Sequence, residues 1–481
     1  MEILFIIITL VVAAVINLMT KRKVIIEVIS LISSFVALIG SIILALKVSS
    51  SGLFAPWSGR FFSIDSLGAI IILILGLVGF ATTIYSIQYL RQEINKDIIG
   101  FKRFKEYFIL LNIFFAAMFL ATTASNPIFT WISIEGTTLS TAFLISFYNK
   151  PSAIEGAWKY LIINSIGLLL GFFGTLLFFT SIDLSSVGLV DWHSLSLNAI
   201  HLDPLLAKIA FVFVLIGYGT KVGLVPMHTW KPDAYSKAPA PIGALLSSAL
   251  LPISFVIILR YKAITDIAVG PLFSQKLLIT FGFLSIAVAA LIMFNAKNYK
   301  RLLAYSSIEN AGVMALGFGF GGIGIFAAVL HLIYHSCVKV VLFLSSGNLL
   351  LKYGSAKIFN IKGALKVIPA TSIIFIIGFL IVTGIPPFGM FMTKLYILSA
   401  GMKDYPLVSV FALFFLVLVF VSFLKHVSAM FFGEKPENIE KGEKNIWLLI
   451  PQISLIVIII ILSFYLPPFL HTLINNVVLQ Y

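Results

Sequence analysis

Eight side chains that can carry a charge or a proton occur inside long apolar segments of this 481-residue sequence. They are Glu135, Lys159, Lys221, Glu309, His331, His335, Lys339 and Lys394. Burying one charged group in the centre of a lipid bilayer costs from about 3 to more than 10 kcal/mol, so such groups usually serve an ion or proton path. Desolvation disfavours the charged form of a buried group, whereas a nearby opposite charge favours it. A buried lysine whose ion pair opens and closes can therefore release and take up a proton.

Lys221 lies in the most unusual of these segments, GYGTKVGLVPMHTWKPDAYSKAPAP at residues 217–241. The apolar run breaks at Pro226 and continues after Pro241, and His228 and Asp233 fall in the break as candidate supporting groups.

Glu135, in WISIEGTTLS, has no basic residue three or four positions away, so its neutralising charge must come from another helix. Lys221 is the best candidate partner, and Glu309 is a second buried carboxylate with a supporting role.

His331, His335 and Lys339 are spaced four residues apart, which places them on one face of a helix. A lone buried histidine is usually just a hydrogen-bonded polar group, but three titratable groups on one face favour a proton wire. The His331–His335 pair lacks the glutamate of a zinc-binding HExxH motif, so no metal site is predicted here. Lys159 is close to a predicted helix end, where it could equally extend to the membrane surface or act in transfer.

The composition predicts a helical integral membrane protein, because 60% of the residues are hydrophobic and only 11% are charged. The single cysteine, Cys337, excludes a disulfide framework, a four-cysteine zinc site and an iron–sulfur cluster ligated by this chain alone. No cofactor is expected in this chain. The first apolar segment is followed by a KRK run, so it is expected to be a retained helix.

Fourteen apolar segments are long enough to cross a bilayer about 30 Å thick. Most Lys and Arg residues fall in the odd-numbered loops, with Lys231 and Lys237 counted among them. By the positive-inside rule these loops face the cytoplasm and both termini face outward, in a cytoplasmic (inner) membrane. The net charge of +14 is then explained by topology and lipid contact, and nucleic acid binding is not expected.

Segments seven (205–226) and twelve (367–402) are interrupted, the latter by GIPPFG with Pro387 at its centre. The predicted organisation is helices 1–3 at 1–104, one five-helix unit at 105–262, a second at 263–432, and helix 14 at 433–481. An odd number of helices in each unit makes the second copy inverted, and paired broken helices mark a midplane site in transporters. Lys221 precedes its break whereas Lys394 follows its own, and the halves share no convincing side-chain identity.

The stretches KVGLVPMHTWKPDAYSKAPAP, KRLLAYSSIENAG and HLIYHSCVKVVLFLSSGN resemble the core of the antiporter-like subunits of complex I, Mrp antiporters and group 4 hydrogenases. The resemblance covers about residues 105–400. WISIEGTTLSTAFLISFY, AIEGAWKYLIINSIGLLLGFFGTLLF and AYSSIEN are most similar to hydrogenase-4 component F and the membrane-bound hydrogenase type. The resemblance implies fourteen helices, inverted repeats and a midplane polar axis. It also implies a Glu135–Lys221 ion pair that Lys159 modulates, and Lys394 as the last residue of the axis.

The sequence departs from this pattern in segment eight. There LLSSALLPISF offers Ser247, Ser248 and Pro252 where many relatives place a lysine or histidine. Segment twelve carries lysine where some members have glutamate. The chain ends after segment fourteen, without the lateral helix of the complex I L-type subunit.

These observations predict a proton- or sodium-translocating subunit of a membrane-bound redox complex of the group 4 hydrogenase or formate hydrogenlyase type. Protons would pass along Lys221, His335, Lys339 and Lys394. Expected partners are other antiporter-like and small membrane subunits, together with cytoplasmic redox subunits that hold iron–sulfur clusters and a NiFe or other redox centre. The alternatives are a subunit of an Mrp-type sodium/proton antiporter or of NADH-quinone oxidoreductase, and a non-conducting scaffold.

Overall fold

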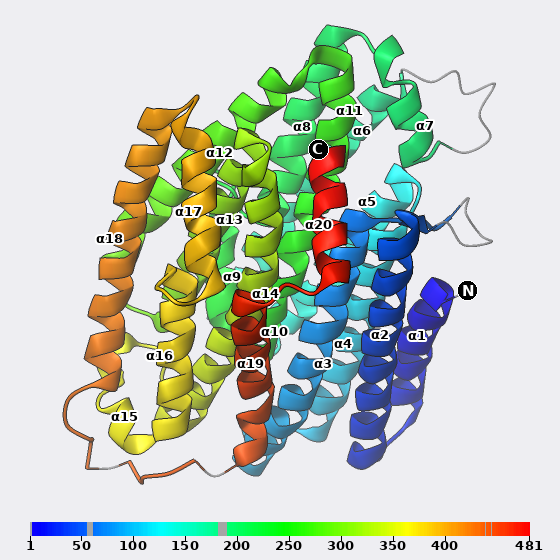
Figure 1. Ribbon diagram of the computed structural model, residues 1–481. Coiled ribbons are helices and arrows are strands. Elements are labelled where there is room, and N and C mark those ends of the chain that lie inside the picture. The colour runs from blue at the N-terminus through cyan, green and yellow to red at the C-terminus, as the bar shows by residue number, and fades with distance from the viewer. Residues whose placement is uncertain (1, 55–60, 181–189, 438, 444) are drawn as a thin grey trace.

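The computed structural model describes residues 2–54, 61–180, 190–437, 439–443 and 445–481. Its long helices stand side by side in one bundle (Figure 1). The first six are α1 (Glu2–Met19), α2 (Lys23–Ser51), α3 (Ser66–Asn95), α4 (Phe101–Thr123), α5 (Pro127–Ile145) and α6 (Pro151–Phe179). A short antiparallel hairpin of β1 (Leu53–Phe54) and β2 (Ile64–Asp65) joins α2 to α3.

The middle of the chain begins with α7 (Trp192–Leu197), the 3₁₀ turn η1 (Ala199–His201), α8 (Pro204–Val222) and α9 (Trp230–Lys237). It continues with α10 (Ala240–Leu245), the π-helical turn η2 (Leu246–Leu250), α11 (Leu251–Val269), α12 (Pro271–Met293), α13 (Tyr299–Phe320) and α14 (Ile323–Tyr353). The remainder is η3 (Ile358–Asn360), α15 (Ala364–Val367), α16 (Pro369–Thr383), α17 (Gly389–Met402), α18 (Pro406–Phe431), η4 (Ile446–Leu448), α19 (Ile450–Phe464) and α20 (Pro468–Gln480).

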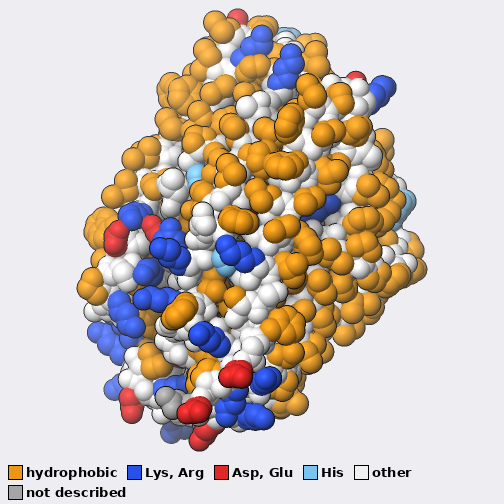
Figure 2. Space-filling view, turned by 90° about the vertical axis from the view of Figure 1, so that its left-hand side faces the viewer, with side chains coloured by type: hydrophobic (Ala, Val, Ile, Leu, Met, Phe, Trp, Pro, Cys, Tyr) orange, Lys and Arg blue, Asp and Glu red, His pale blue; other side chains and the backbone are white. Residues whose placement is uncertain are grey.

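Twelve spans within the described residues are long and apolar enough to cross a membrane. The equally long α13 and the α16–α17 pair bring the number of passes to fourteen, which agrees with the predicted all-α polytopic fold. Hydrophobic side chains cover most of the height of the molecule, and many Lys and Arg side chains gather toward its lower end (Figure 2). The C-terminus lies in the upper half and the N-terminal end of α1 near mid-height, whereas the α1–α2 loop and α15 lie at the lower end (Figure 1).

The two predicted helix breaks are confirmed, and they have the same local design. α8 ends at Val222 with Gly223 at φ +80°, and α16 ends at Thr383 with Gly384 at φ +81°. A left-handed residue of this kind is the usual helix C-cap and favours glycine. A cis X-Pro bond follows three residues later in each case, at Pro226 and at Pro387. Each break exposes backbone carbonyls in the interior of the bundle, where polar side chains can reach them.

The eighth span is continuous but irregular, because η2 forms a π-helical turn directly before Pro252. Proline cannot donate the usual helical hydrogen bond, and a π turn is one way a helix accommodates that loss. The Tyr235 hydroxyl of α9 donates to the Leu246 carbonyl of this turn at 2.8 Å. The irregular turn therefore lies against the second half of the broken seventh span.

The last span differs from its predicted extent of 446–467. α19 ends at Phe464, and after a break before Pro468 the chain forms α20, which packs against α2, α3 and α14. Prolines commonly mark the end of a helix, and here they interrupt a span instead. The division into units at 105–262 and 263–432 stays a prediction.

Candidate functional site: a buried polar axis

Lys221 is buried in the last turn of α8, with 1% of its surface exposed. Its ammonium donates to Thr138 Oγ1 at 2.7 Å and to Tyr160 Oη at 2.8 Å, and it lies 4.8 Å from the centre of the Tyr160 ring. These neutral oxygens and the aromatic face stabilise the lysine without neutralising it.

The predicted direct ion pair between Glu135 and Lys221 is absent from the described contacts. The Glu135 carboxylate accepts from Ser165 at 3.0 Å and lies 3.5 Å from Thr138 Oγ1. Thr138 thus stands between the two charges, which remain close enough to interact electrostatically. The reason is the direction of Glu135: it lies half-buried on a face of α5 that also carries the exposed Ile132 and Leu139.

Lys159 is not a buried group. Nearly half of its side chain, 47%, is exposed, and it forms ion pairs with Glu155 at 2.6 Å and Asp233 at 3.3 Å. Asp233 also pairs with Arg301 at 2.7 Å. Of the two alternatives open from the sequence, the structure favours a surface position for Lys159, and Asp233 belongs to this surface cluster and not to the axis.

Lys231 is a buried lysine that the sequence-based topology wrongly assigned to a cytoplasmic loop. It is fully buried in α9, and its ammonium donates to the carbonyl of Val222, the last residue of α8, at 2.6 Å. A Cβ atom on Gly223 would lie 2.6 Å from Lys231 Cδ, so the glycine also leaves room for this side chain. Lys231 is close enough to His335 and Lys339 for their charges to interact.

Lys394 occupies the matching place after the second break. Its ammonium donates to the Val382 and Thr383 carbonyls at the end of α16, at 3.2 and 3.4 Å. The carboxyl end of a helix carries partial negative charge and favours a cation. Lys231 at the first break and Lys394 at the second thus make the same kind of contact, each donating to a carbonyl at the end of the interrupted helix.

Glu309 was expected to play a supporting role, and it is the partner in the buried ion pair of the second half. Its carboxylate lies 3.0 Å from the Lys394 ammonium, and both groups are buried. A buried charge is tolerated when it is paired and hydrogen-bonded, and each partner here makes further contacts. The pair joins α13 to α17.

The α13 helix connects the remaining titratable groups of the second half. Lys339 donates to Ser306 Oγ at 2.8 Å and to the Leu303 carbonyl at 3.1 Å. One turn further, Asn310 contacts Glu309 and lies 2.9 Å from His331 Nε2. The other His331 nitrogen lies 2.8 Å from Thr393 Oγ1 on α17.

Ser306, Glu309 and Asn310 all belong to the sequence AYSSIEN, so this one motif supplies the links between Lys339, His331 and Lys394. Only Glu309 among them was singled out from the sequence, since serine and asparagine carry no titratable signal.

His335 is fully buried, and neither of its ring nitrogens has a hydrogen-bond partner among the described residues. Ser248 in η2 is likewise unpartnered there, whereas neighbouring Ser247 lies 2.7 Å from Ser307 on α13. Buried polar groups are nearly always hydrogen-bonded, so an uncommitted imidazole is unusual. Both nitrogens of His335 are thus uncommitted, and Lys231 and Lys339 are near enough for their charges to interact with it.

His228 lies in the first break and is almost buried, with its ring centre 6.4 Å from that of Tyr305. Its Nδ1 atom has no partner within the described part of the chain. Its backbone carbonyl accepts from the Lys231 N–H at 3.0 Å, and its ring is near enough to Lys231 for their charges to interact.

Known proteins resemble this chain in sequence. A family model described as the transmembrane part of NADH:quinone oxidoreductase and Mrp antiporters matches residues 124–422. The hydrogenase-4 component F homolog of Methylacidiphilum infernorum is 32% identical over 439 residues, covering 90% of each chain.

Two solved structures share the fold. A subunit of the membrane-bound sulfane sulfur reductase, an archaeal respiratory membrane complex, aligns with a TM-score of 0.86 at 23% identity, over all of this chain and 96% of the other. A subunit of the Mrp complex from Dietzia sp. aligns with a TM-score of 0.87 at 18% identity, over 99% and 96%.

Proposed function

Because the chain belongs to the membrane-subunit family of NADH:quinone oxidoreductase and Mrp antiporters, we propose that it moves protons along its buried polar axis. The similarity to a hydrogenase-4 component F homolog supports placing it in a complex of the group 4 hydrogenase or formate hydrogenlyase type. The complex would lie in the cytoplasmic membrane with both termini of this subunit outside.

The observation that carries the proposal is that four lysines, Lys221, Lys231, Lys339 and Lys394, are buried in the bundle. We infer that they form one polar axis. Each is held by neutral hydroxyls or backbone carbonyls, and only Lys394 has a direct carboxylate partner among the described residues. A lysine in such surroundings can exist as an amine or as an ammonium, since the balance depends on nearby charges. A charge that moves at one end of the axis therefore changes the proton affinity of the next lysine.

In this proposal Lys231 takes the place of the lysine or histidine that many relatives carry in segment eight. It lies between the first-half group around Lys221 and the His335–Lys339 pair, with which its charge interacts. The proposed order is Lys221, Lys231, His335, Lys339 and then the Glu309–Lys394 pair.

The energy for transport comes, in this proposal, from partner subunits. The only cysteine of this chain is buried, so the iron–sulfur clusters and the NiFe or other redox centre belong to cytoplasmic partners. Glu135 supports a membrane partner as well, because it is only partly buried and shares its face of α5 with the exposed apolar residues Ile132 and Leu139. A carboxylate facing hydrocarbon is costly, so we infer that another membrane subunit covers this face of α5.

Replacing Lys231 tests the proposed link. Lys231→Met keeps most of the side-chain volume but cannot carry a proton, so redox-driven proton uptake into inside-out vesicles should fall at least tenfold. The measurement is quenching of a pH-sensitive dye in vesicles that hold the complete complex.

The matched control is Lys159→Met, which removes an exposed lysine and leaves Asp233 paired with Arg301. We expect its proton uptake to stay within twofold of the wild type. Normal uptake by Lys231→Met, in vesicles with the normal amount of complex, would contradict the proposed order of transfer.

A further inference from the structure

A second group of buried charges, outside the axis, lies at the end of the bundle that the topology assigns to the cytoplasm. It borders a cavity of about 620 Å³ formed by α3, the α5–α6 connection, α9, α13 and α14, here called the lysine pocket. Its lining includes four lysines, Lys96, Lys150, Lys237 and Lys300, and a single carboxylate, Glu93.

Glu93 forms the inner wall of the lysine pocket and is 2% exposed. The Tyr148 hydroxyl donates to one of its oxygens at 2.5 Å and lies 3.1 Å from the Tyr89 hydroxyl. The second carboxylate oxygen, Oε2, has no hydrogen-bond partner among the described residues. A buried carboxylate without a direct cation partner binds a proton readily, because desolvation penalises its charged form.

Lys300 connects this wall to the axis. It is 2% exposed, donates to the Ala238 carbonyl at 3.1 Å, and is near enough to Glu93 for their charges to interact. One turn further along α13, the Leu303 carbonyl accepts from Lys339. Lys300 and Ser306, the other partner of Lys339, are separated by about 9 Å of helix at 1.5 Å per residue.

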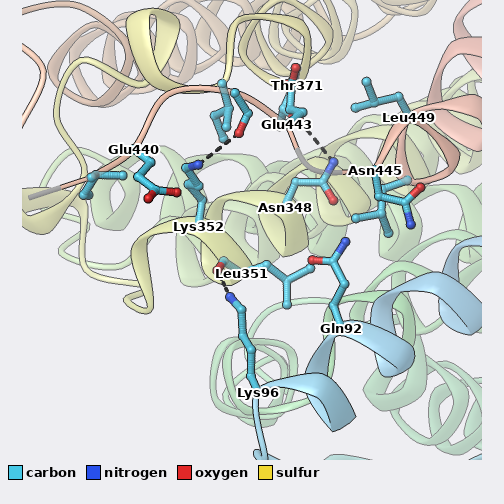
Figure 3. Close-up of a pocket in the computed structure, with 14 residues that line it drawn as sticks. Gln92, Lys96, Asn348, Leu351, Lys352, Thr371, Glu440, Glu443, Asn445 and Leu449 are labelled. Atoms are coloured by element: carbon cyan, nitrogen blue, oxygen red, sulfur yellow. Dashed lines mark hydrogen bonds between the residues drawn. The ribbon is translucent and has the colours of Figure 1, made fainter.

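A neighbouring cavity of about 380 Å³ lacks a comparable buried carboxylate (Figure 3). It shares Lys96 with the lysine pocket, and that side chain contacts the Leu351 carbonyl. Its buried polar side chains are Asn348 and Thr371, hydrogen-bonded at 3.2 Å, and neither an amide nor a hydroxyl changes its charge in the physiological range. Its carboxylates, Glu440 and Glu443, are not buried.

We propose that the lysine pocket is the cytoplasmic loading site for the transported ion, and that this ion is the proton and not sodium. The proposal rests on the function proposed above. A proton from water in the pocket converts the Glu93 carboxylate to the acid, which then gives that proton to the Lys300 amine and returns to the carboxylate. Lys300 passes it toward Lys339. Four lysines around one carboxylate repel a hydrated sodium ion, whereas a proton can move by transfer between neighbouring groups.

The first test is Glu93→Gln, which preserves the size of the side chain but removes its acid–base function. Initial rates of redox-driven proton uptake in inside-out vesicles should fall at least tenfold. The matched control is Glu106→Gln, which removes a carboxylate on the same side of the membrane that pairs with Arg103 outside the pocket, and it should transport normally. Wild-type rates in Glu93→Gln would overturn the proposal.

Failure of this proposal can be told apart from failure of the proposed function. If Glu93→Gln transports normally while Lys231→Met does not, the axis works and the entrance lies elsewhere. If both transport normally, the proposed function fails as well. Uptake of radioactive sodium by the same vesicles, above that of vesicles lacking the complex, would overturn the choice of ion.

The second test adds a cysteine to this chain, whose own Cys337 is buried. The unmutated complex, treated with the same reagent, measures any effect on cysteines of partner subunits. In Ser236→Cys, a thiol lines the lysine pocket, and a membrane-impermeant thiol reagent added outside inside-out vesicles should block proton uptake. Asn360→Cys, on the exposed loop before α15, should react without loss of uptake. Undiminished uptake by fully labelled Ser236→Cys would contradict a route through this pocket.

Discussion

Lys221→Ala is expected to lower redox-driven proton uptake by the assembled complex at least a hundredfold, the largest effect of any single substitution in this chain. The change removes the ammonium that donates to both Thr138 and Tyr160. The measurement is dye quenching in inside-out vesicles, with redox turnover of the partner subunits followed in the same sample. Turnover is expected to persist, because this subunit holds none of the proposed redox chemistry.

Two further variants separate proton transfer from packing. Lys221→Met fills most of the same volume without a charge, so it should lose transport as completely as Lys221→Ala. Lys208→Ala removes an exposed lysine from the same helix and should have little effect. Transport at the normal rate by Lys221→Met would rule out Lys221 as a proton carrier.

The second large effect is expected at the Glu309–Lys394 pair. There a double substitution should restore stability without restoring proton transport. Lys394→Met leaves a buried carboxylate without its cation, and breaking a buried pair in this way destabilises proteins by about 3–5 kcal/mol. The double variant Glu309→Gln/Lys394→Met contains no unpaired charge and should recover most of that loss. It should still transport no protons, because neither position can then change its charge.

The measurements are the thermal unfolding midpoint of the purified complex and proton uptake in vesicles. The coupling between the two substitutions comes from comparing both single variants with the double variant. Equal destabilisation by the double and single variants would show that the ion pair is not what holds α13 against α17. Restored transport in the double variant would exclude the pair from the proton path.

Much of the architecture could be predicted because hydropathy and helix periodicity are properties of each segment on its own. Long apolar runs predict the spans, and glycine followed by proline predicts the interruptions at Pro226 and Pro387. The burial of Lys221, Lys339 and Lys394 followed from the same reasoning, since a charge within an apolar run has no route to water.

The partners of these charges could not be predicted in this way. Glu135 and Lys221 are separated by Thr138, whereas Lys394 pairs with Glu309, because partner choice depends on how helices far apart in sequence are rotated and spaced. Lys231 lies between the predicted apolar segments 205–226 and 238–260, so a charge-counting topology assigned it to a loop.

The sequence alone placed eight titratable groups within apolar segments. It thereby predicted a membrane subunit that moves protons. The tertiary structure decided where the charged groups lie: Lys159 is at the surface, Lys231 is an additional buried lysine, and Glu309 pairs with Lys394. The physical reason is that a helix break turns backbone carbonyls inward, and only the folded bundle shows which lysine reaches them.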